Sequence, residues 1–197
     1  MSRVHLRQFQ NDWYQPGRSM VWRALWMFLG QPLFRSVWFP SSNLRAQLLC
    51  LFGAQIGERV VIRQGVTVKY PWRLMVGDDC WIGEQVWFDI LAMVRLGNDV
   101  CLSQGVYLCT GNHDWSDPTF GLLISGIEIQ DGGWAGAKSI LMPGARLGEA
   151  AICAAGSVVS GTISDYQIVA GNPALAVRTR KIRELDCSHS VLNEVAR

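Results

Sequence analysis

The sequence predicts an all-β protein whose strands wind into a parallel β-helix of hexapeptide repeats. An apolar residue recurs every six positions, often with glycine directly after it and a small or aliphatic residue four positions after it. A helix needs a period near 3.6 and a simple strand a period near 2. A period of six therefore indicates short strands separated by tight corners, with three strands to each triangular coil. The repeat positions are Ile56, Ile62, Val68, Val76, Ile82, Phe88, Leu96, Leu102, Leu108, Ile129, Ala135, Leu141, Leu147, Cys153 and Val159.

The repeat divides the chain into three parts. We expect an N-terminal extension over residues 1–52, the β-helix over residues 53–177 and a C-terminal tail over residues 178–197. The six-residue count slips by two after Val68 and after Phe88, and it stops between Leu108 and Ile129. This longest interruption predicts an inserted loop over residues 111–126, and loops on a rigid scaffold are where binding residues collect.

The N-terminal extension is expected to form two short amphipathic helices. The first has an apolar face and ends near Gly30-Gln31-Pro32, and the second begins after Ser41-Ser42-Asn43 and ends at Gly53. Arg23, Gly30, Pro32 and Arg35 interrupt the apolar residues of the first helix, which makes a poor membrane span, and the start of the chain lacks the apolar core of a signal peptide. Residues 20–52 either pack against the β-helix or make peripheral membrane contact, because Trp with flanking Arg is typical of an interfacial helix, and the two alternatives are compatible.

The composition excludes several classes of protein. Hydrophobic residues make up 49% of the 197 residues and charged residues 17%, so we expect a substantial core rather than disorder. A net charge of +2 is too small to indicate nucleic-acid binding. The cysteines form no CxxC pair, and no histidine lies at metal-ligand spacing from them. We therefore expect buried reduced thiols and no metal, and reduced thiols suit a cytoplasmic protein. The cysteines are Cys50, Cys80, Cys101, Cys109, Cys153 and Cys187.

His113 is the candidate catalytic residue. It lies in the polar segment Cys109–Trp115, where the repeat stops, whereas His5 lies in the polar N-terminus and His189 in the tail. A lone histidine is more often structural, but a neutral imidazole with a pKa of about 6.5 can remove a proton near neutral pH. No residue looks like an activated nucleophile, and Cys109 is the nearest candidate for one. The sequence therefore indicates one general base.

Four segments resemble the hexapeptide-repeat acyltransferases, and within them the O-acetyltransferases of colanic acid and exopolysaccharide biosynthesis. The segments are Leu51–Gly57, Tyr70–Trp72, Leu108–Asp114 and Ala170–Ala174, and the resemblance covers about residues 45–182. It implies a left-handed β-helix, an exception to the usual right-handed crossover. It also implies a homotrimer with acetyl-CoA in a groove between subunits, His113 as general base, and a carbohydrate acceptor, free or linked to a lipid or nucleotide.

The resemblance also suggests residues for each substrate. The acceptor residues are Asp89, Asn112 and Asp114. Alternatively, Asp89 is a turn residue, and Asp114 and Asp117 either orient His113 or cap the backbone of their own loop. The expected acetyl-CoA residues are Trp134, Gly136, Ala137, Ala155, Ser160, Arg178 and Lys181, although coil corners also need small residues for the fold alone. Many relatives have a lysine directly after the residue that matches Ser160, and Gly161 at this place puts one phosphate contact in doubt.

Other functions compete with sugar O-acetylation. A zinc enzyme of the γ-carbonic-anhydrase type shares the fold but needs three histidine ligands, and the coils hold only His113, so we reject it. An N-acetyltransferase of an amino sugar and a xenobiotic acetyltransferase share the repeat and the histidine, and they stay open. A non-catalytic scaffold is less favoured because the segment Thr110–Asp114 is intact.

Overall fold

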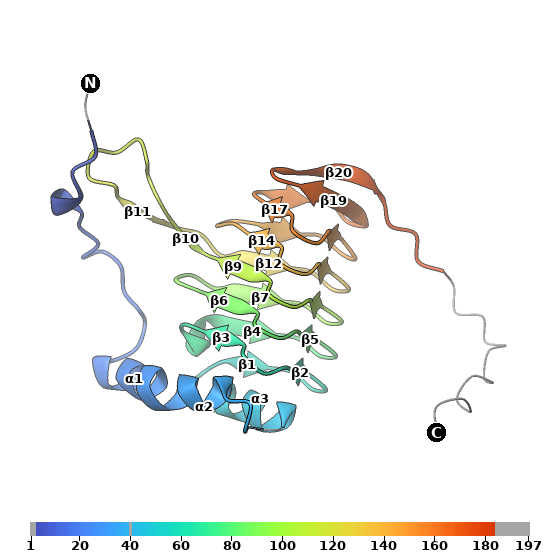
Figure 1. Ribbon diagram of the computed structural model, residues 1–197, viewed down its shortest axis with the longest axis horizontal. Coiled ribbons are helices and arrows are strands. Elements are labelled where there is room, and N and C mark those ends of the chain that lie inside the picture. The colour runs from blue at the N-terminus through green and yellow to red at the C-terminus, as the bar shows by residue number, and fades with distance from the viewer. Residues whose placement is uncertain (1–2, 40, 184–197) are drawn as a thin grey trace.

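The computed structural model describes residues 3–39 and 41–183, and its centre is a parallel β-helix (Figure 1). The chain visits three flat faces in turn, which we name A, B and C, and successive coils pair through parallel strands. Face A holds β1 (Gln55–Ile56), β4 (Leu74–Val76), β7 (Val94–Leu96), β12 (Ile127–Ile129), β15 (Arg146–Leu147) and β18 (Thr162–Ile163). Face B holds β2 (Val61–Ile62), β5 (Trp81–Ile82), β8 (Cys101–Leu102), β13 (Trp134–Ala135), β16 (Ile152–Cys153) and β19 (Gln167–Gly171), and face C holds β3 (Thr67–Val68), β6 (Trp87–Asp89), β9 (Tyr107–Cys109), β14 (Ile140–Leu141) and β17 (Val158–Val159).

The repeat residues fill the interior of the coils. Ile82 and Leu102 stack on face B, Phe88 and Leu108 stack on face C, and none of the four is more than 1% exposed. On face B, Val86 and Val106, four positions after Ile82 and Leu102, are buried in the next inward position. Burial of these side chains removes a continuous apolar column from water, which is the main stabilising term for a fold without long strands. The predicted period and the predicted inward positions are confirmed.

The corners depend on left-handed backbone and on stacked polar side chains. Gly105 turns the B–C corner with a φ of 68°, and Gln85 and Lys138 take the same conformation at the equivalent positions of the coils before and after it. At the A–B corner, Asn98 Oδ1 accepts a hydrogen bond of 2.9 Å from the backbone N–H of Asp78, and Asn98 itself donates its N–H to Asp131 Oδ1 at 2.8 Å. This ladder explains why Asp or Asn follows the aliphatic-Gly pair in successive repeats.

The N-terminal helices differ in one respect from the expectation. α1 (Met20–Leu25), a π-helical segment (Trp26–Gly30) and α2 (Gln31–Arg35) form one continuous helix, followed by α3 (Ser42–Leu51). The predicted end of the first helix at Gly30-Gln31-Pro32 is therefore wrong. Gln31 donates its N–H to Trp26 O, five residues back, and this wider turn allows the chain to pass Pro32, which has no N–H to donate. Gly30 leaves room for the Trp26 ring, which lies 2.4 Å from where a Cβ would be.

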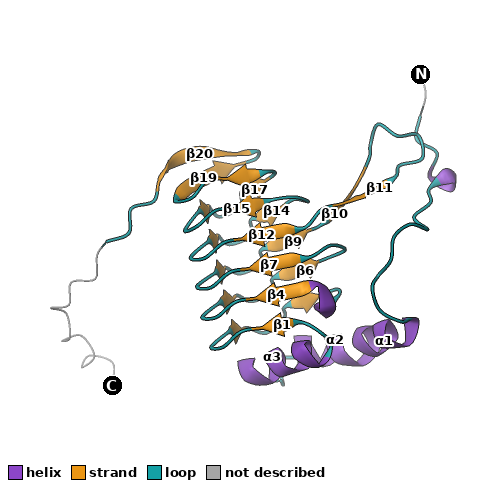
Figure 2. Cartoon of the chain, turned by 180° about the vertical axis from the view of Figure 1, so that it is seen from behind, coloured by secondary structure: helices purple, strands orange, loops and turns teal. Residues whose placement is uncertain are grey.

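The helices cap the open end of the first coil (Figure 2). Ser42 Oγ donates to Ile62 O at 3.1 Å and accepts from Ile62 N at 3.2 Å, so one hydroxyl satisfies both edge groups of a residue in β2. The indole of Trp26 donates to Val68 O at 2.8 Å, and Gly65 N donates to Arg35 O at 3.3 Å. Packing against the β-helix, the first of the two predicted alternatives, is thus observed. No helix in the described part of the chain is long and apolar enough to cross a membrane.

The last coil ends in an antiparallel pair. β20 (Ala174–Thr179) folds back on β19 across the segment Gly171–Pro173, and it extends two residues past the point where the tail was expected to begin. The rest of the predicted tail, residues 184–197, lies outside the described residues.

The five cysteines of the described residues form no disulfide. Cys80 and Cys153 are buried inside the coils as predicted, and burial raises the pKa of the Cys80 thiol to about 11, so it stays protonated. Cys101 and Cys109 are half-buried at outward positions. Cys50 is exposed on α3, so the prediction of a buried thiol is wrong there, and Cys187 lies outside the described residues.

Candidate active site

The interruption after Leu108 contains a β-hairpin. β10 (Gly111–His113) and β11 (Leu122–Ile124) pair antiparallel, with His113 opposite Leu122. The hairpin leaves the stack between β9 and β12, at the C–A corner, and projects from the β-helix on the side of the N-terminus (Figure 1). The chain predicted as a loop over residues 111–126 is therefore partly strand, and His113 lies on a paired strand rather than in open loop.

A backbone carbonyl orients the His113 ring. Nδ1 lies 2.9 Å from the backbone oxygen of Phe120, and the two rings stack with centroids 4.3 Å apart and an angle of 8° between their planes. A carbonyl oxygen can only accept a hydrogen bond, so Nδ1 carries the proton and Nε2 holds the free lone pair. This is the tautomer that a general base needs at Nε2, and Phe120 rather than an acidic residue selects it.

The N-terminal segment lies against the hairpin. We call residues 3–19 the N-terminal arm. Its His5 N–H donates to Pro118 O at 2.8 Å, and the edge of the Phe9 ring meets His113 with centroids 5.5 Å apart. Further along, Tyr14 donates its hydroxyl to Leu91 O at 3.2 Å. His113 is thus half-buried between an aromatic residue of its own hairpin and one more than a hundred positions earlier in the chain.

Two aspartates hold the hairpin loop together. Asp114 Oδ1 accepts from Ser116 N at 2.9 Å, Ser116 Oγ at 2.5 Å and Asp117 N at 3.2 Å, while Asp117 accepts from the backbone and hydroxyl of Thr119. These hydrogen bonds lower the pKa of both carboxyl groups. The sequence left open whether these aspartates orient His113 or cap the backbone of their own loop, and the contacts match capping. Neither carboxylate is hydrogen-bonded to His113; Asn112, next to it, is exposed and accepts from the His113 N–H through Oδ1 at 2.8 Å.

Asp89 lies at the end of β6, one coil before the hairpin. Its carboxylate accepts from Lys69 Nζ at 2.9 Å and from the Tyr107 hydroxyl at 3.0 Å. Burial raises the pKa of Tyr107, so this hydroxyl remains a donor. Asp89 pairs in register with Cys109, two residues before the hairpin, and the Cys109 thiol lies 3.0 Å from Gly111 O. Asp89 is thus near the base of the hairpin, but the Lys69 ammonium and the Tyr107 hydroxyl already donate to its two oxygens.

The residues expected to hold acetyl-CoA lie mostly at another corner. Trp134 is on face B and donates its indole N–H to Ser103 Oγ at 2.9 Å. Gly136 and Ala137 follow at the B–C corner, and a Cβ at Gly136 would lie 2.6 Å from Ala155 N in the next coil. Ser160 follows β17 at the C–A corner, Arg178 lies in β20, and Lys181 lies beyond that strand. One chain therefore does not bring the B–C corner residues together with His113.

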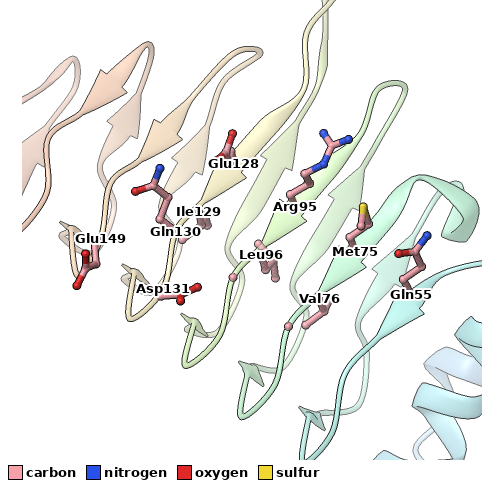
Figure 3. Close-up of a pocket in the computed structure, with 12 residues that line it drawn as sticks. Gln55, Met75, Val76, Arg95, Leu96, Glu128, Ile129, Gln130, Asp131 and Glu149 are labelled. Carbon is pink, nitrogen blue, oxygen red and sulfur yellow. The ribbon is translucent and has the colours of Figure 1, made fainter.

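An open groove elsewhere on the β-helix does not include His113. It has a volume of about 690 Å³, is open to solvent and runs along face A across successive coils (Figure 3). Its outward side chains include Met75, Arg95 and Glu128, and Glu128 forms an ion pair of 2.9 Å with Arg146. The groove contains no histidine, and the candidate site is therefore placed at His113. No group of three or more His, Cys, Asp or Glu that could hold a metal occurs in residues 3–39 and 41–183.

Sequence reasoning did not identify Phe120 and Phe9. Phe120 accepts the hydrogen bond through its backbone oxygen, and because every residue has one, its side-chain type gives no signal in the sequence. Its left-handed conformation, with a φ of 55°, is visible only in the structure. Phe9 reaches His113 only through tertiary folding, and no periodic signal in the polar N-terminus marks it.

Comparisons with known proteins agree with the fold. No protein-family profile matches the chain. WcaF of Escherichia coli strain K12, provisionally named a colanic acid biosynthesis acetyltransferase, is 35% identical over 166 residues, which cover 83% of this chain and 90% of the relative. The crystal structure of the hexapeptide-repeat acetyltransferase VCA0836 of Vibrio cholerae has a TM-score of 0.74 at 20% identity, over 82% of this chain and 92% of the other.

A galactoside acetyltransferase solved in complex with coenzyme A has a TM-score of 0.72 at 20% identity, over 84% of this chain and 85% of the other. At such identities the two solved structures establish the fold alone, whereas WcaF is a relative along most of both chains. The stacked parallel coils, the hexapeptide pattern and this relationship together show that the chain belongs to the hexapeptide-repeat acetyltransferases.

Proposed function

We propose that this protein transfers an acetyl group from acetyl-CoA to a sugar hydroxyl, with His113 as the general base. The observation that carries the proposal is the hydrogen bond between Nδ1 of His113 and Phe120 O, because it leaves Nε2 free to accept a proton. The names of the relatives support the two substrates: one is a colanic acid biosynthesis acetyltransferase, and one is a galactoside acetyltransferase that binds coenzyme A.

The reaction follows from the position of that lone pair. Nε2 removes the proton of the acceptor hydroxyl as its oxygen attacks the carbonyl carbon of the thioester. A C–O bond forms, the C–S bond then breaks, and the imidazolium returns the proton to the departing sulfur of coenzyme A. No acyl-enzyme is needed, and Cys109 has no role in the transfer. Asn112, Asp89 and Asp114 are the proposed contacts of the acceptor.

We further propose that the complete site forms between copies in a homotrimer. The proposed donor residues Trp134, Ala137 and Ala155 lie at or beside the B–C corner, whereas His113 projects from the C–A corner, so a second copy has to supply one half. Face B supports this arrangement, because its outward positions form an apolar column in register from coil to coil, in which Trp81 and Trp134 are 50% and 43% exposed. The column is Val61, Trp81, Cys101, Trp134, Ile152 and Ile168.

The residues proposed for the two parts of acetyl-CoA, the pantetheine arm and the phosphates, differ in size and charge. Gly136 and the small residues of the B–C corner leave room for the pantetheine arm beside the backbone, and Arg178 and Lys181 are exposed cations suited to phosphate. Ser160 is the remaining proposed contact, and Gly161 after it provides no cation.

The test is acetyl transfer from radiolabelled acetyl-CoA to a panel of sugars that includes galactosides, maltose and amino sugars. We expect label in the sugar, and release of the label by alkaline hydroxylamine, which cleaves oxygen esters but not amides. The His113→Ala variant should lose at least about 100-fold in rate, while Cys109→Ala should keep it. Hydroxylamine-resistant label would identify an N-acetyltransferase instead. Transfer that persists in His113→Ala, or coenzyme A binding without transfer to any acceptor, would contradict the proposal.

A further inference from the structure

The long N-terminal helix is apolar on two opposite sides, and only one of them is covered. Trp26 and Phe34 face the β-helix and are at most 1% exposed. The other side presents a row at helical spacing that continues past the end of α2 to Trp38, and within it Phe28 is 69%, Leu29 65% and Trp38 90% exposed. We call this row the exposed stripe: Val21, Leu25, Phe28, Leu29, Leu33, Val37 and Trp38. Contiguous exposed apolar residues of this kind mark an interaction surface.

The charges around the exposed stripe indicate what covers it. The first 57 residues contain six arginines, no lysine and a single acidic residue, Asp12, while the rest of the chain carries more acidic than basic residues. Arg18 precedes the helix and Arg35 ends it, and both are exposed. Beside the exposed stripe lies an open hollow of about 540 Å³, lined by Met27, Gln31, Pro32, Arg35, Ser36 and Gly65. Arg35 at the rim of this hollow can pair with a phosphate group that lies beside an apolar layer.

We propose that the exposed stripe docks this protein on the surface of a bilayer that contains anionic lipids. Apolar side chains enter the boundary of the acyl chains, exposed Trp38 lies at headgroup depth, and Arg18 and Arg35 contact lipid phosphates. The helix lies flat in the surface because its opposite side is fixed to the first coil through Trp26 and Phe34.

The N-terminal arm links the docked helix to the catalytic hairpin. The N-terminal arm runs from the start of α1 to the hairpin, where Phe9 contacts His113 (Figures 1 and 2). The hairpin lies further along the stack than the helix (Figure 1), so an acceptor carried on a lipid would have to extend from the docked surface to reach His113. The docking itself does not depend on the proposed function, since lipid binding is measured without substrates.

The experiment is flotation of the full-length protein with vesicles made of equal parts phosphatidylglycerol and phosphatidylcholine, and with vesicles of phosphatidylcholine alone. We expect the protein to float with the anionic vesicles, and binding to weaken as salt is raised. Phe28→Ser with Leu29→Ser should lower the vesicle partition coefficient at least about tenfold, since each buried side chain contributes strongly to partition. Arg18→Gln and Arg35→Gln should each lower it about fivefold.

The matched control removes two equally exposed apolar residues from the opposite end of the molecule. Leu175→Ser with Val177→Ser, both on β20, should float like the wild type. Light scattering of each variant reports its mass in solution, and transfer from acetyl-CoA to a water-soluble sugar reports its catalytic site. The proposal fails if the wild type does not float with anionic vesicles at low salt, or if the Phe28 and Leu29 variant floats as well as the control. A fall in mass for that variant would instead assign the exposed stripe to contact between copies, and would equally overturn lipid docking.

Discussion

Phe120 presents both its ring and its backbone oxygen to His113: the rings stack 4.3 Å apart, and the oxygen lies 2.9 Å from Nδ1. The left-handed conformation of Phe120, with a φ of 55°, lets one residue make both contacts. The ring fixes the plane of the imidazole, and the oxygen fixes which nitrogen carries the proton. These two effects can be separated by mutation.

Replacing Phe120 by glycine removes the ring and keeps the carbonyl, and glycine accepts a φ of 55° without strain. We expect a folded protein whose kcat falls about tenfold while KM for acetyl-CoA changes little, because a looser imidazole is misplaced for proton transfer. Steady-state kinetics measure this. Phe120→Tyr keeps the stacking ring and serves as the control with near wild-type kcat. An unchanged kcat in Phe120→Gly would show that stacking does not position His113.

Substitutions of Asp114 test whether its carboxylate stabilises the hairpin loop or binds the acceptor. Because its hydrogen bonds lower its pKa, the carboxylate stabilises the folded loop above its unfolded pKa of about 3.9. This stabilisation is lost as the pH falls through the lower folded pKa. We expect lower protection of the Ser116 and Asp117 amides, relative to their intrinsic exchange rates, below about pH 4, and in Asp114→Ala already at neutral pH.

The matched variant is Asp114→Asn, whose Oδ1 can still accept from Ser116 and Asp117. It should keep slower exchange than Asp114→Ala and lose less kcat. If Asp114→Ala instead raises KM for the acceptor and leaves amide exchange in the loop as in the wild type, Asp114 binds the acceptor and the capping role is secondary.

Phe9 covers one edge of His113 from the N-terminal arm. Removing its ring in Phe9→Ala should open the site to water and lower kcat/KM for the acceptor about three- to tenfold, which is the range of one lost aromatic contact of about 0.5–1.5 kcal/mol. Leu6→Ala, in the same arm but 67% exposed, is the control and should behave as the wild type. Equal effects of the two changes would mean that the arm acts only as a whole, without a specific contact at Phe9.

Trp26 tests the attachment of the N-terminal helix to the first coil. Trp26→Phe retains most of the apolar ring but leaves Val68 O without its indole donor, which should lower the free energy of unfolding by about 1–3 kcal/mol. Urea unfolding followed by circular dichroism measures the change. Trp38→Phe, at a side chain 90% exposed, should stay within about 0.5 kcal/mol of the wild type. A stable Trp26→Phe variant would show that packing alone holds the helix.

The sequence predicts those parts of the molecule that repeat. Ile82, Leu102 and Ala135 obey one local rule, so the pattern gives the coil, the inward positions and the corners without tertiary information. It also isolates His113, because the rule stops directly before it. The orientation of His113 is not predictable in this way, since Phe120 contributes a backbone atom and Phe9 comes from a distant segment.

The N-terminal helix shows a second limit. Val21, Trp22, Leu25, Trp26 and Phe28 look like one apolar face in the sequence, but Trp26 and Phe28 are two positions apart and lie on opposite sides of the helix, so Trp26 is buried while Phe28 is exposed. The π-helical segment at Trp26–Gly30 also shifts the positions that follow it. A single extra residue in one turn is invisible to a count based on 3.6 residues. The division between a packed side and a free side therefore emerged only in three dimensions.

The cap on the first coil has a consequence for self-association. A stack of parallel coils ends in unpaired N–H and C=O groups, and such an edge can template another chain. Ser42 and Trp26 occupy edge groups of β2 and β3, and at the far end β20 folds antiparallel over β19. A chain shortened to begin at residue 53 would expose the edge groups of β2 and β3, and we expect it to self-associate through this one bare end. The N-terminal extension therefore also protects the first coil against edge-to-edge association.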